Sequence, residues 1–396
     1  MTRPLLVIFL TIFVNLVGFG IIIPLLPFYA ETFGASPFVI GLLFASFSVS
    51  QLLAAPVLGE LSDRYGRRPV LIFSLIGTAL SFAMLAVAHS LTMLFLARIV
   101  DGLSGGNITT ARAYIADVTN EEDRAKSFGL LGAAFGLGFI VGPALGALFS
   151  QISYTAPIWA AAVITIVATV LAWVWLPETV HRAQASAGSP WKALRDLKGR
   201  QQLRVLFAVD FVYWTAFAVY QTAFALFGAR RFGFDAADTG YLLSAFGFLG
   251  ALVQGMLVGP VVRAFGPKRT LVAGLIFAAL GLGGGALTES VPVFVAMLVP
   301  AALGIGLCNA TLSTLISIAA GAHEQGRVQG AAGALESLGR TIGPVWGNGV
   351  MEVFGEGKSF GGAAALLLGA AVLTTRYHGA ERPTLIPTPA DARDVK

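Results

Sequence analysis

The sequence predicts an all-α integral membrane protein, with twelve transmembrane helices in two six-helix bundles related by a pseudo-twofold axis. Three observations predict this fold. First, the 396 residues are 56% hydrophobic and only 12% charged, with a mean hydropathy of +0.79, whereas a soluble domain carries about a quarter charged residues. Second, apolar runs of helical length recur along the whole chain. Third, the second half repeats sequence features of the first.

Twelve hydrophobic segments recur along the chain, most of them long enough to cross a hydrocarbon layer of about 30 Å as helices. They do not alternate polar and apolar residues, which argues against barrel strands. The first six lie near residues 5–28, 39–61, 69–88, 91–116, 126–150 and 155–176. The second six lie near residues 204–229, 239–263, 269–288, 291–319, 325–350 and 359–375.

The basic residues indicate how these spans are oriented. If alternate loops lie on opposite sides, 20 of the 26 lysines and arginines fall on one side, together with both termini. The positive-inside rule predicts that this side is the cytoplasmic side of a cell (inner) membrane. We therefore predict an N-terminal bundle at residues 1–176 and a C-terminal bundle at residues 204–378. A cytoplasmic central loop at residues 177–203 joins them, and a cytoplasmic tail follows at residues 379–396.

An internal repeat supports the division into two halves. The stretch that begins at Gly59 after span 2 has a counterpart that begins at Gly259 after span 8. In span 5, a series of small residues and a proline recurs in span 11 at an offset near 200 residues, with Pro143 matched by Pro344. Two similar halves predict a substrate site between them, near the middle of the membrane.

Several classes of function are disfavoured. Cys308 is the single cysteine, and the four histidines have no ligand spacing, so we predict no metal site. The chain contains no phosphate-binding loop for ATP, and we expect no cofactor. An intramembrane enzyme would need a nucleophile and base within the spans, and none is found. Membrane topology accounts for the basic balance, so we expect no nucleic-acid partner.

Three motifs resemble signatures of the major facilitator superfamily. The loop after span 2 reads Gly59-x-Leu-x-Asp63-Arg64-x-Gly66-Arg67-Arg68, as in the family's loop 2–3 motif. Span 4 contains Leu94-x-x-x-Arg98-x-x-Asp101-Gly102, which resembles the helix-4 motif, with aspartate where glutamine is usual. Span 5 contains Gly138-x-x-x-Gly142-Pro143-x-x-Gly146, similar to the helix-5 motif of the antiporters. The chain thus resembles the twelve-helix drug:proton antiporters, and in particular the tetracycline efflux proteins.

The chain departs from the tetracycline exporters at three positions. Those exporters carry intramembrane aspartates in helices 1, 3 and 9, where this chain has Asn15, Ser81 and Ala278. Proton coupling is therefore expected elsewhere, and the resemblance does not by itself assign tetracycline as the substrate.

The resemblance implies gating roles for two regions. The loop motif would latch the cytoplasmic side shut in the outward-open state, with Asp63 near the N-terminus of span 11. The alternative is that Arg64, Arg67 and Arg68 only set the topology. In span 5, the glycines Gly138, Gly142 and Gly146 form a smooth stripe, and Pro143 permits a bend. We expect this stripe to be the surface on which the halves move, with plain packing as the alternative.

Span 4 has the most unusual pattern of charge. In one continuous helix, Arg98, Asp101 and Arg112 fall within about 80° of one another. Charges at this depth are costly, so the stripe should face a water-filled cavity. A conformational change that separates Asp101 from Arg98 would change its proton affinity and couple protons to transport. A permanently paired structural salt bridge is the alternative.

Spans 7 and 11 supply the remaining candidates. Span 7 carries an aromatic and polar stripe that suits an amphipathic substrate, made of Asp210, Tyr213, Trp214, Phe217, Gln221 and Phe224. The alternative places these aromatics in the core or against lipid. We add Asn15 and Asn309 to the predicted substrate site. In span 11, Glu336 and Arg340 form an i, i+4 pair, either as a structural pair or as part of a proton relay.

The sequence thus predicts a monomeric secondary transporter that exports a lipophilic small molecule in exchange for protons by alternating access. The alternative is a proton-coupled or facilitative transporter of a metabolite, sugar or lipid with the same fold.

Overall fold

The computed structural model describes residues 3–105, 107–119, 121–178, 200–320 and 324–377, and within these ranges all regular structure is helical. The first half contains α1 (Arg3–Glu31), α2 (Pro37–Tyr65), α3 (Arg67–Ala86), α4 (Leu91–Ser104), α5 (Asn107–Val118), α6 (Glu121–Ser150) and α7 (Ala156–Trp175). The second half contains α9 (Gln201–Phe232), α10 (Ala236–Leu252), η2 (Val253–Leu257), α11 (Val258–Phe265), α12 (Pro267–Leu287), α13 (Val291–Ala320), α14 (Gln325–Phe354) and α15 (Glu356–Thr375).

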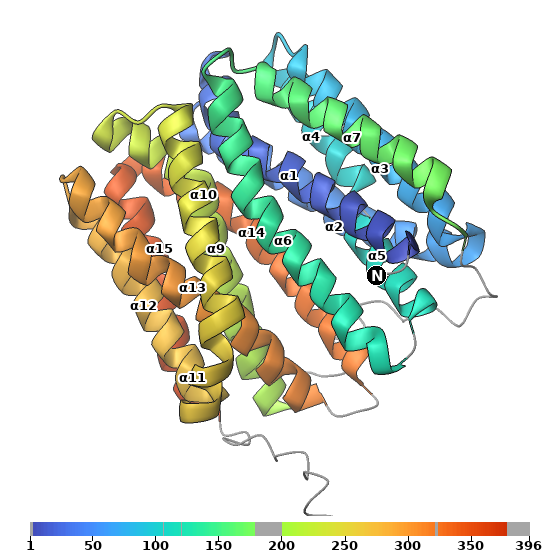
Figure 1. The fold of residues 1–396 in the computed structure, drawn as a ribbon. Helices are drawn as coiled ribbons and strands as arrows, with labels where there is room; N and C mark the ends of the chain where they lie inside the picture. The colour runs from blue at the N-terminus through green and yellow to red at the C-terminus, as the bar shows by residue number, and fades with distance from the viewer. Residues whose placement is uncertain (1–2, 106, 120, 179–199, 321–323, 378–396) are drawn as a thin grey trace, which may run out of the picture.

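The helices form two bundles, as predicted. Figure 1 shows α1–α7 on one side and α9–α15 on the other, with α6 and α14 running between them. The described chain stops at Glu178 and resumes at Arg200, so most of the predicted central loop lies outside the described residues, as does the predicted tail at 379–396.

Ten spans are long and apolar enough to cross a membrane, judged over the described residues. The predicted spans 4 and 11 are the two that fall outside this group. Span 4 is broken into α4 and α5, and α14 is a 30-residue helix with several polar and charged side chains. The fold is consistent with twelve crossings and identifies a multi-pass membrane protein.

Two spans are not the continuous α-helices that the sequence suggested. The prediction of one helix over 91–116 was wrong, because α4 ends at Ser104 and α5 starts at Asn107, with Gly105 between them. Glycine favours such a break, since it loses more conformational freedom in a helix than other residues. Span 8 contains the π-helical turn η2 between α10 and α11.

Local sequence signals explain several helix ends. Ser36 caps α2 by accepting a hydrogen bond from the Val39 amide, and Asp235 caps α10 in a reciprocal capping box with Asp238. The sharp turns after α2 and α11 are made by Gly66 and Gly266 at φ 112° and 79°, in the region that favours glycine. These two turns lie 200 residues apart and occupy matching places in the two halves.

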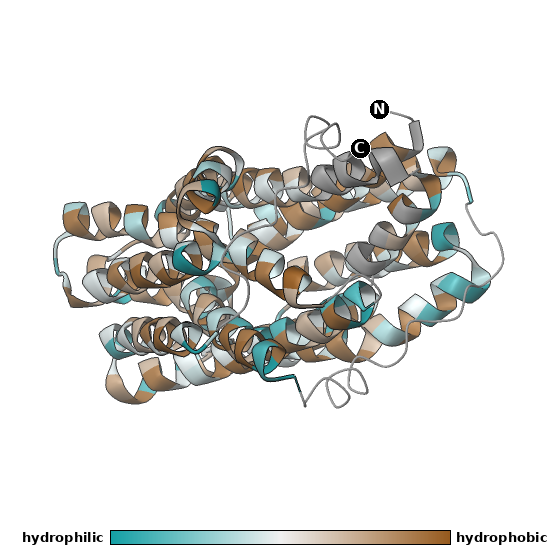
Figure 2. Cartoon of the chain, turned by 90° about the horizontal axis from the view of Figure 1, so that it is seen from below, coloured by the Kyte–Doolittle hydropathy of each residue, from teal (hydrophilic) through white to brown (hydrophobic). Residues whose placement is uncertain are grey.

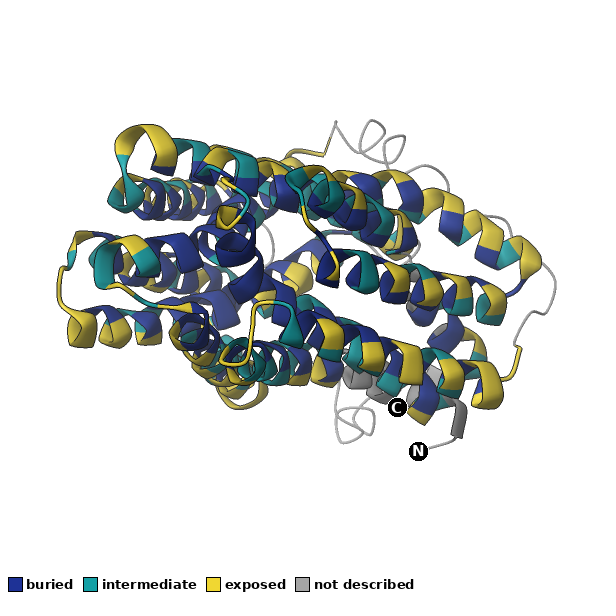
Figure 3. Cartoon of the chain, turned by 90° about the horizontal axis from the view of Figure 1, so that it is seen from above, coloured by how far each residue is buried: buried dark blue, intermediate teal, exposed yellow. Residues whose placement is uncertain are grey.

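The outer surface is apolar. Large hydrophobic side chains such as Leu53, Phe73, Trp173 and Val353 are exposed on the helices, and brown, apolar faces run along much of the two bundles (Figure 2). Buried residues gather inside each bundle, while exposed ones lie on the outer faces (Figure 3). An apolar exterior of this kind matches a lipid environment rather than water.

Candidate functional site: a cavity between the two halves

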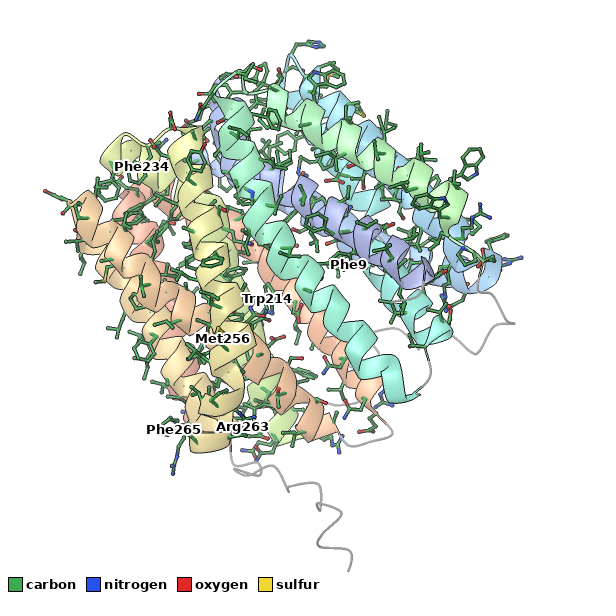
Figure 4. All side chains as sticks on the ribbon, in the orientation of Figure 1. Phe9, Trp214, Phe234, Met256, Arg263 and Phe265 are labelled. Atoms are coloured by element: carbon green, nitrogen blue, oxygen red, sulfur yellow. The ribbon has the colours of Figure 1, made fainter. Side chains whose placement is uncertain are left out.

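The molecule has two ends, which we name by their residues. The basic end holds Arg67, Arg68, Lys268 and Arg269, beside the turns at Gly66 and Gly266. The far end holds the turns at Gly34, Gly233 and Gly355. Figure 4 shows Arg263 and Phe265 at the basic end of the second half and Phe234 at its far end.

The two halves meet closely between the middle of the molecule and the far end. A methyl group on Gly41 of α2 would lie 2.4 Å from Pro344 O of α14, and one on Gly240 of α10 would lie 2.6 Å from Pro143 O of α6. Ser244 of α10 also donates a hydrogen bond to Ile140 O of α6, at 2.7 Å. The two glycine–proline contacts are pseudo-symmetric, since the second helix of each half packs against the proline of the fifth helix of the other.

The halves separate toward the basic end. A methyl group on Gly59 of α2, or on Gly330 or Gly333 of α14, would meet nothing within 4 Å. The same holds for Gly132 of α6 and Gly250 of α10. The helix pairs that touch near the two prolines are therefore apart at the basic end, so the cleft between the halves opens there.

Polar contacts join the halves at the far end. The amide of Phe38, at the start of α2, donates a hydrogen bond of 2.8 Å to Glu352 of α14. Ser36 and this amide hold the pKa of Glu352, which lies beyond the predicted span 325–350, below its usual range. Glu31 at the end of α1 and Arg230 near the end of α9 lie 3.7 Å apart. We call these two pairings the far-end contacts.

A cavity lies where the halves meet. It is bounded by α1, α2 and α4 of the first half and by α9 and α14 of the second. Its lining comprises Phe19, Ile23, Phe44, Phe47, Ser48, Gln51, Arg98, Ala218, Gln221, Thr222, Ser337, Arg340 and Pro344. Three of the predicted site residues, Arg98, Gln221 and Arg340, thus meet in one place. Sequence reasoning missed Ser48 and Gln51, although two polar residues one turn apart in an apolar span are a signal that could have identified them.

Arg98 and Asp101 pair as their spacing predicted. The Arg98 Nη1 atom lies 2.8 Å from Asp101 Oδ2, and Arg98 is only 2% exposed. Gly102 lets α4 approach α2, because a methyl group there would lie 2.4 Å from Phe47 O. This approach places the Phe47 ring 4.3 Å from the Arg98 guanidinium carbon. Because α4 ends at Ser104 and α5 starts at Asn107, the expected stripe is not the face of one continuous helix, and the side chain of Arg112 lies outside the described residues.

The second half has a larger charge cluster. Glu336 and Arg340 of α14 lie 3.8 Å apart, and the Arg340 guanidinium carbon is 4.8 Å from the Trp214 ring centre. Asp210 of α9 lies within electrostatic range of Glu336 and Arg340. It is 3% exposed, and its Oδ2 atom has no hydrogen-bond partner among the described residues. Figure 4 shows Trp214 near the middle of the molecule.

The predicted aromatic stripe of span 7 divides into two environments. Gln221 lines the cavity, and Trp214 and Phe217 are half-buried. Tyr213 instead donates a hydrogen bond to Ile305 O, and Phe224 is fully buried against Phe294, so both belong to the core of the second half. Asn15 is half-buried and Asn309 is exposed, and neither is part of the cavity lining.

The glycine stripe of α6 packs differently from the prediction. Methyl groups on Gly138 and Gly142 would lie 2.5 Å from Leu16 Cβ and 2.7 Å from Val17 O, both on α1 of the same half. Gly146 faces Ile21, which also lies on α1. The expectation that this stripe is the surface between the halves was therefore wrong, because spacing reveals a smooth face but not the neighbour that covers it. Other glycines face the opposite half, among them Gly41, Gly240 and Gly247.

The loop motif forms a network within the first half. Arg67 binds Asp63, and its Nε atom lies 3.0 Å from Asp117. The Arg67 amide, next to the Gly66 turn, donates to Glu178 at 3.0 Å, and Arg68 donates to Trp173 O at 2.5 Å. Arg64 lies over the Tyr65 ring. Gly59, one turn before Asp63, has open space beside it.

Comparison with known proteins adds independent evidence. The family model of the Major Facilitator Superfamily matches residues 8–344. The chain is 35% identical over 379 residues to the class C tetracycline resistance protein of Escherichia coli, covering 93% of this chain and 94% of that protein. It is 29% identical over 349 residues to multidrug resistance protein 2 of Bacillus subtilis, covering 85% and 86%.

A solved structure agrees with these relatives. The crystal structure of the human organic anion transporter MFSD10 (TETRAN) matches with a TM-score of 0.73 and 25% identity, covering 94% of this chain and 99% of that one. The paired six-helix halves, the loop and helix motifs and the match over most of the length agree, and the chain therefore belongs to the major facilitator superfamily.

Proposed function

We propose that this protein is a secondary active transporter that exports an amphipathic small molecule or drug in exchange for protons by alternating access. The observation that carries the proposal is a cavity at the point where two pseudo-symmetric halves change from contact to separation. A site at that point can be exposed to one side at a time when the halves rock about it. The relatives named for tetracycline resistance and multidrug resistance support a drug as the exported compound.

The direction of opening follows from the charge distribution. Basic residues concentrate in the loops at the basic end, and the positive-inside rule then assigns this end, with both termini, to the cytoplasm. With this assignment, the separation between the halves would open toward the cytoplasm, the side from which a substrate for export enters. In the opposite state, the far-end contacts would be broken and the motif at Asp63 would meet the N-terminus of α14.

Proton coupling is proposed for the Arg98–Asp101 pair. Both side chains are buried beside the cavity, and removing charge from water is costly unless it is paired. A proton on Asp101 removes the pairing to Arg98, so binding of the proton and the arrangement of α4 are linked. Glu336 and Arg340 form an ion pair of the second half, on α14.

The substrate is proposed to contact both halves. Gln221 and Arg340 line the cavity on one side and Arg98 on the other, with Phe19, Phe44 and Phe47 as apolar walls. Trp214, against Arg340, extends this surface toward the basic end. Ser81 and Ala278 stand where tetracycline exporters carry aspartates. Both are buried and neither is part of the cavity lining. Because serine and alanine have no titratable side chain, these two positions contribute no group to proton exchange.

Efflux from loaded vesicles tests the proposal. The purified protein is reconstituted, the vesicles are loaded with a panel of lipophilic drugs, and efflux is followed with and without an imposed pH difference. We expect uphill efflux of at least one compound only when the pH difference is present. Transport that ignores the pH difference would remove proton exchange from the proposal, and no transport of any compound would remove drug export.

A further inference from the structure

One edge of the Arg98 guanidinium is left without a protein partner. Its Nη1 atom pairs with Asp101, and the Phe47 ring covers one face. Its Nε and Nη2 atoms are buried and have no hydrogen-bond partner within the described part of the chain. A buried charged donor without an acceptor is costly, so this edge calls for an acceptor that the protein does not provide.

The chemistry of that edge is specific. In the planar guanidinium, Nε–H and one N–H of Nη2 point the same way, and together they match the two oxygens of a carboxylate. A neutral carbonyl oxygen can accept from this edge but brings no compensating negative charge, and a cationic group is repelled. Asp101 already holds the neighbouring position at Nη1, so the open edge is a second acceptor site on the same arginine.

The surroundings suit the rest of such a ligand. Arg98 lines the cavity together with Phe19, Phe44 and Phe47, which offer aromatic faces. Gln51 donates a hydrogen bond to Gly105 O at 3.2 Å, which fixes its carboxamide beside α4. From the second half, Gln221 adds another polar group. The cavity thus combines one paired donor edge with apolar walls.

We propose that the cavity recognises amphipathic organic anions, and that the Nε and Nη2 edge of Arg98 receives their carboxylate. This inference rests on the proposed function in that the ligand is the transported compound. It names the class of that compound and assigns Arg98 to ligand binding as well as to the pair with Asp101.

The test uses three probes with the same aromatic body. These are a coumarin acetic acid, its uncharged methyl ester and a coumarin that carries a quaternary ammonium group. Binding to the purified protein, in nanodiscs of phosphatidylcholine so that no anionic lipid competes, is followed by fluorescence anisotropy. We expect the carboxylate to bind at least about tenfold more tightly than the ester and the cation. Equal affinities, or preference for the cation, would overturn the proposal.

Two variants locate the preference at Arg98. Arg98→Lys keeps the charge but cannot present a paired edge, so the carboxylate should lose most of its advantage while the ester is unchanged. Arg269→Lys, an exposed arginine at the basic end, is the matched control and should keep the full advantage. If Arg98→Lys fails to fold, Asp101→Asn decides, because removal of the neighbouring negative charge should tighten carboxylate binding several-fold. Unchanged binding in that variant contradicts the assignment.

The outcomes separate this inference from the proposed function. Export of neutral or cationic drugs with no preference for carboxylates would leave the transporter standing and refute the anion site. Carboxylate binding that depends on Arg98, without transport of any compound, would support the site and refute drug export.

Discussion

The two halves handle buried charge in different ways. In the first half, Arg98 and Asp101 lie one turn apart on α4 and balance each other. In the second half, Glu336 and Arg340 of α14 lie 3.8 Å apart and are partly exposed, while Asp210 of α9 is buried and its Oδ2 atom has no hydrogen-bond partner among the described residues. A buried carboxylate without a countercharge costs several kcal/mol, so the second cluster needs either a proton or a cationic group, whereas the first needs neither. A shared fold therefore does not imply that the halves share the work of proton coupling equally.

The largest effect is expected at the Arg98–Asp101 pair of the first half. Asp101→Asn should reduce uphill, pH-driven efflux to background, because the titratable partner of Arg98 is lost. Substrate binding and downhill exchange should persist, as measured in vesicles without a pH difference. Asp210→Asn and Glu336→Gln are the matched variants in the second half. Should either of them abolish coupling while Asp101→Asn retains it, the coupling site lies in the second half.

Stability should respond with opposite signs in the two halves. Asp101→Asn leaves Arg98 buried without its carboxylate, which costs about 3 kcal/mol when a buried pair is broken. Asp210→Asn removes the excess carboxylate beside Glu336 and should raise the midpoint of thermal unfolding. Thermal unfolding of the purified variants at neutral pH checks both. A decrease in both variants would show that the second cluster is as well balanced as the first.

Substrate contact on the second half predicts an intermediate effect. Trp214→Ala or Gln221→Ala should weaken the apparent affinity by up to about tenfold, since an aromatic contact contributes roughly 0.5–1.5 kcal/mol. The maximal transport rate should change less. Phe224→Leu, in the core of the same helix, serves as the control. Wild-type affinity in both variants would remove α9 from the site.

The loops at the basic end predict a smaller effect. Asp63→Asn should slow transport a few-fold, because a carboxylate near a helix N-terminus contributes about 0.3–1 kcal/mol. The equivalent position in the second half is Arg263, so Arg263→Gln is the matched control and should change transport less. Initial rates at equal amounts of inserted protein provide the measurement. An equal loss in both variants would assign the effect to loop charge in general.

The smallest effect concerns the far-end contacts. Hydrogen bonds from Ser36 and the Phe38 amide lower the pKa of Glu352. A carboxylate with a lowered pKa stabilises the contact while it is ionised, so the contact weakens as the pH falls through that lowered value. Spin labels on α2 and α14 should report more separation at acidic pH in the wild type. Glu352→Gln should make the distance independent of pH, and a persistent dependence would place the titrating group elsewhere.

The sequence predicted the two bundles, most of the spans and the Arg98–Asp101 pair, because these depend on composition and on spacing along one helix. It failed where the answer depends on a neighbouring helix. The face formed by Gly138 and Gly142 was visible, but its partner α1 was not. Tyr213 was assigned to the site by helix phase, although a core carbonyl at Ile305 binds it. Gln51 was missed because its role depends on how closely α4 approaches α2.

The π-helical turn η2 accommodates a difference in length between the two halves. Gly41 and Gly240 occupy equivalent places against the two prolines, and Gly59 and Gly259 begin the equivalent loops. Gly41 and Gly59 are 18 positions apart in the first half, whereas their counterparts Gly240 and Gly259 are 19 positions apart in the second. A π turn spans one more residue than an α turn, so Val253–Leu257 can absorb a single inserted residue. Without it, the insertion would rotate α11 by roughly 100°. The difference in length between the two helices is thus confined to five residues, and the loop beyond them keeps the place that its counterpart has in the first half.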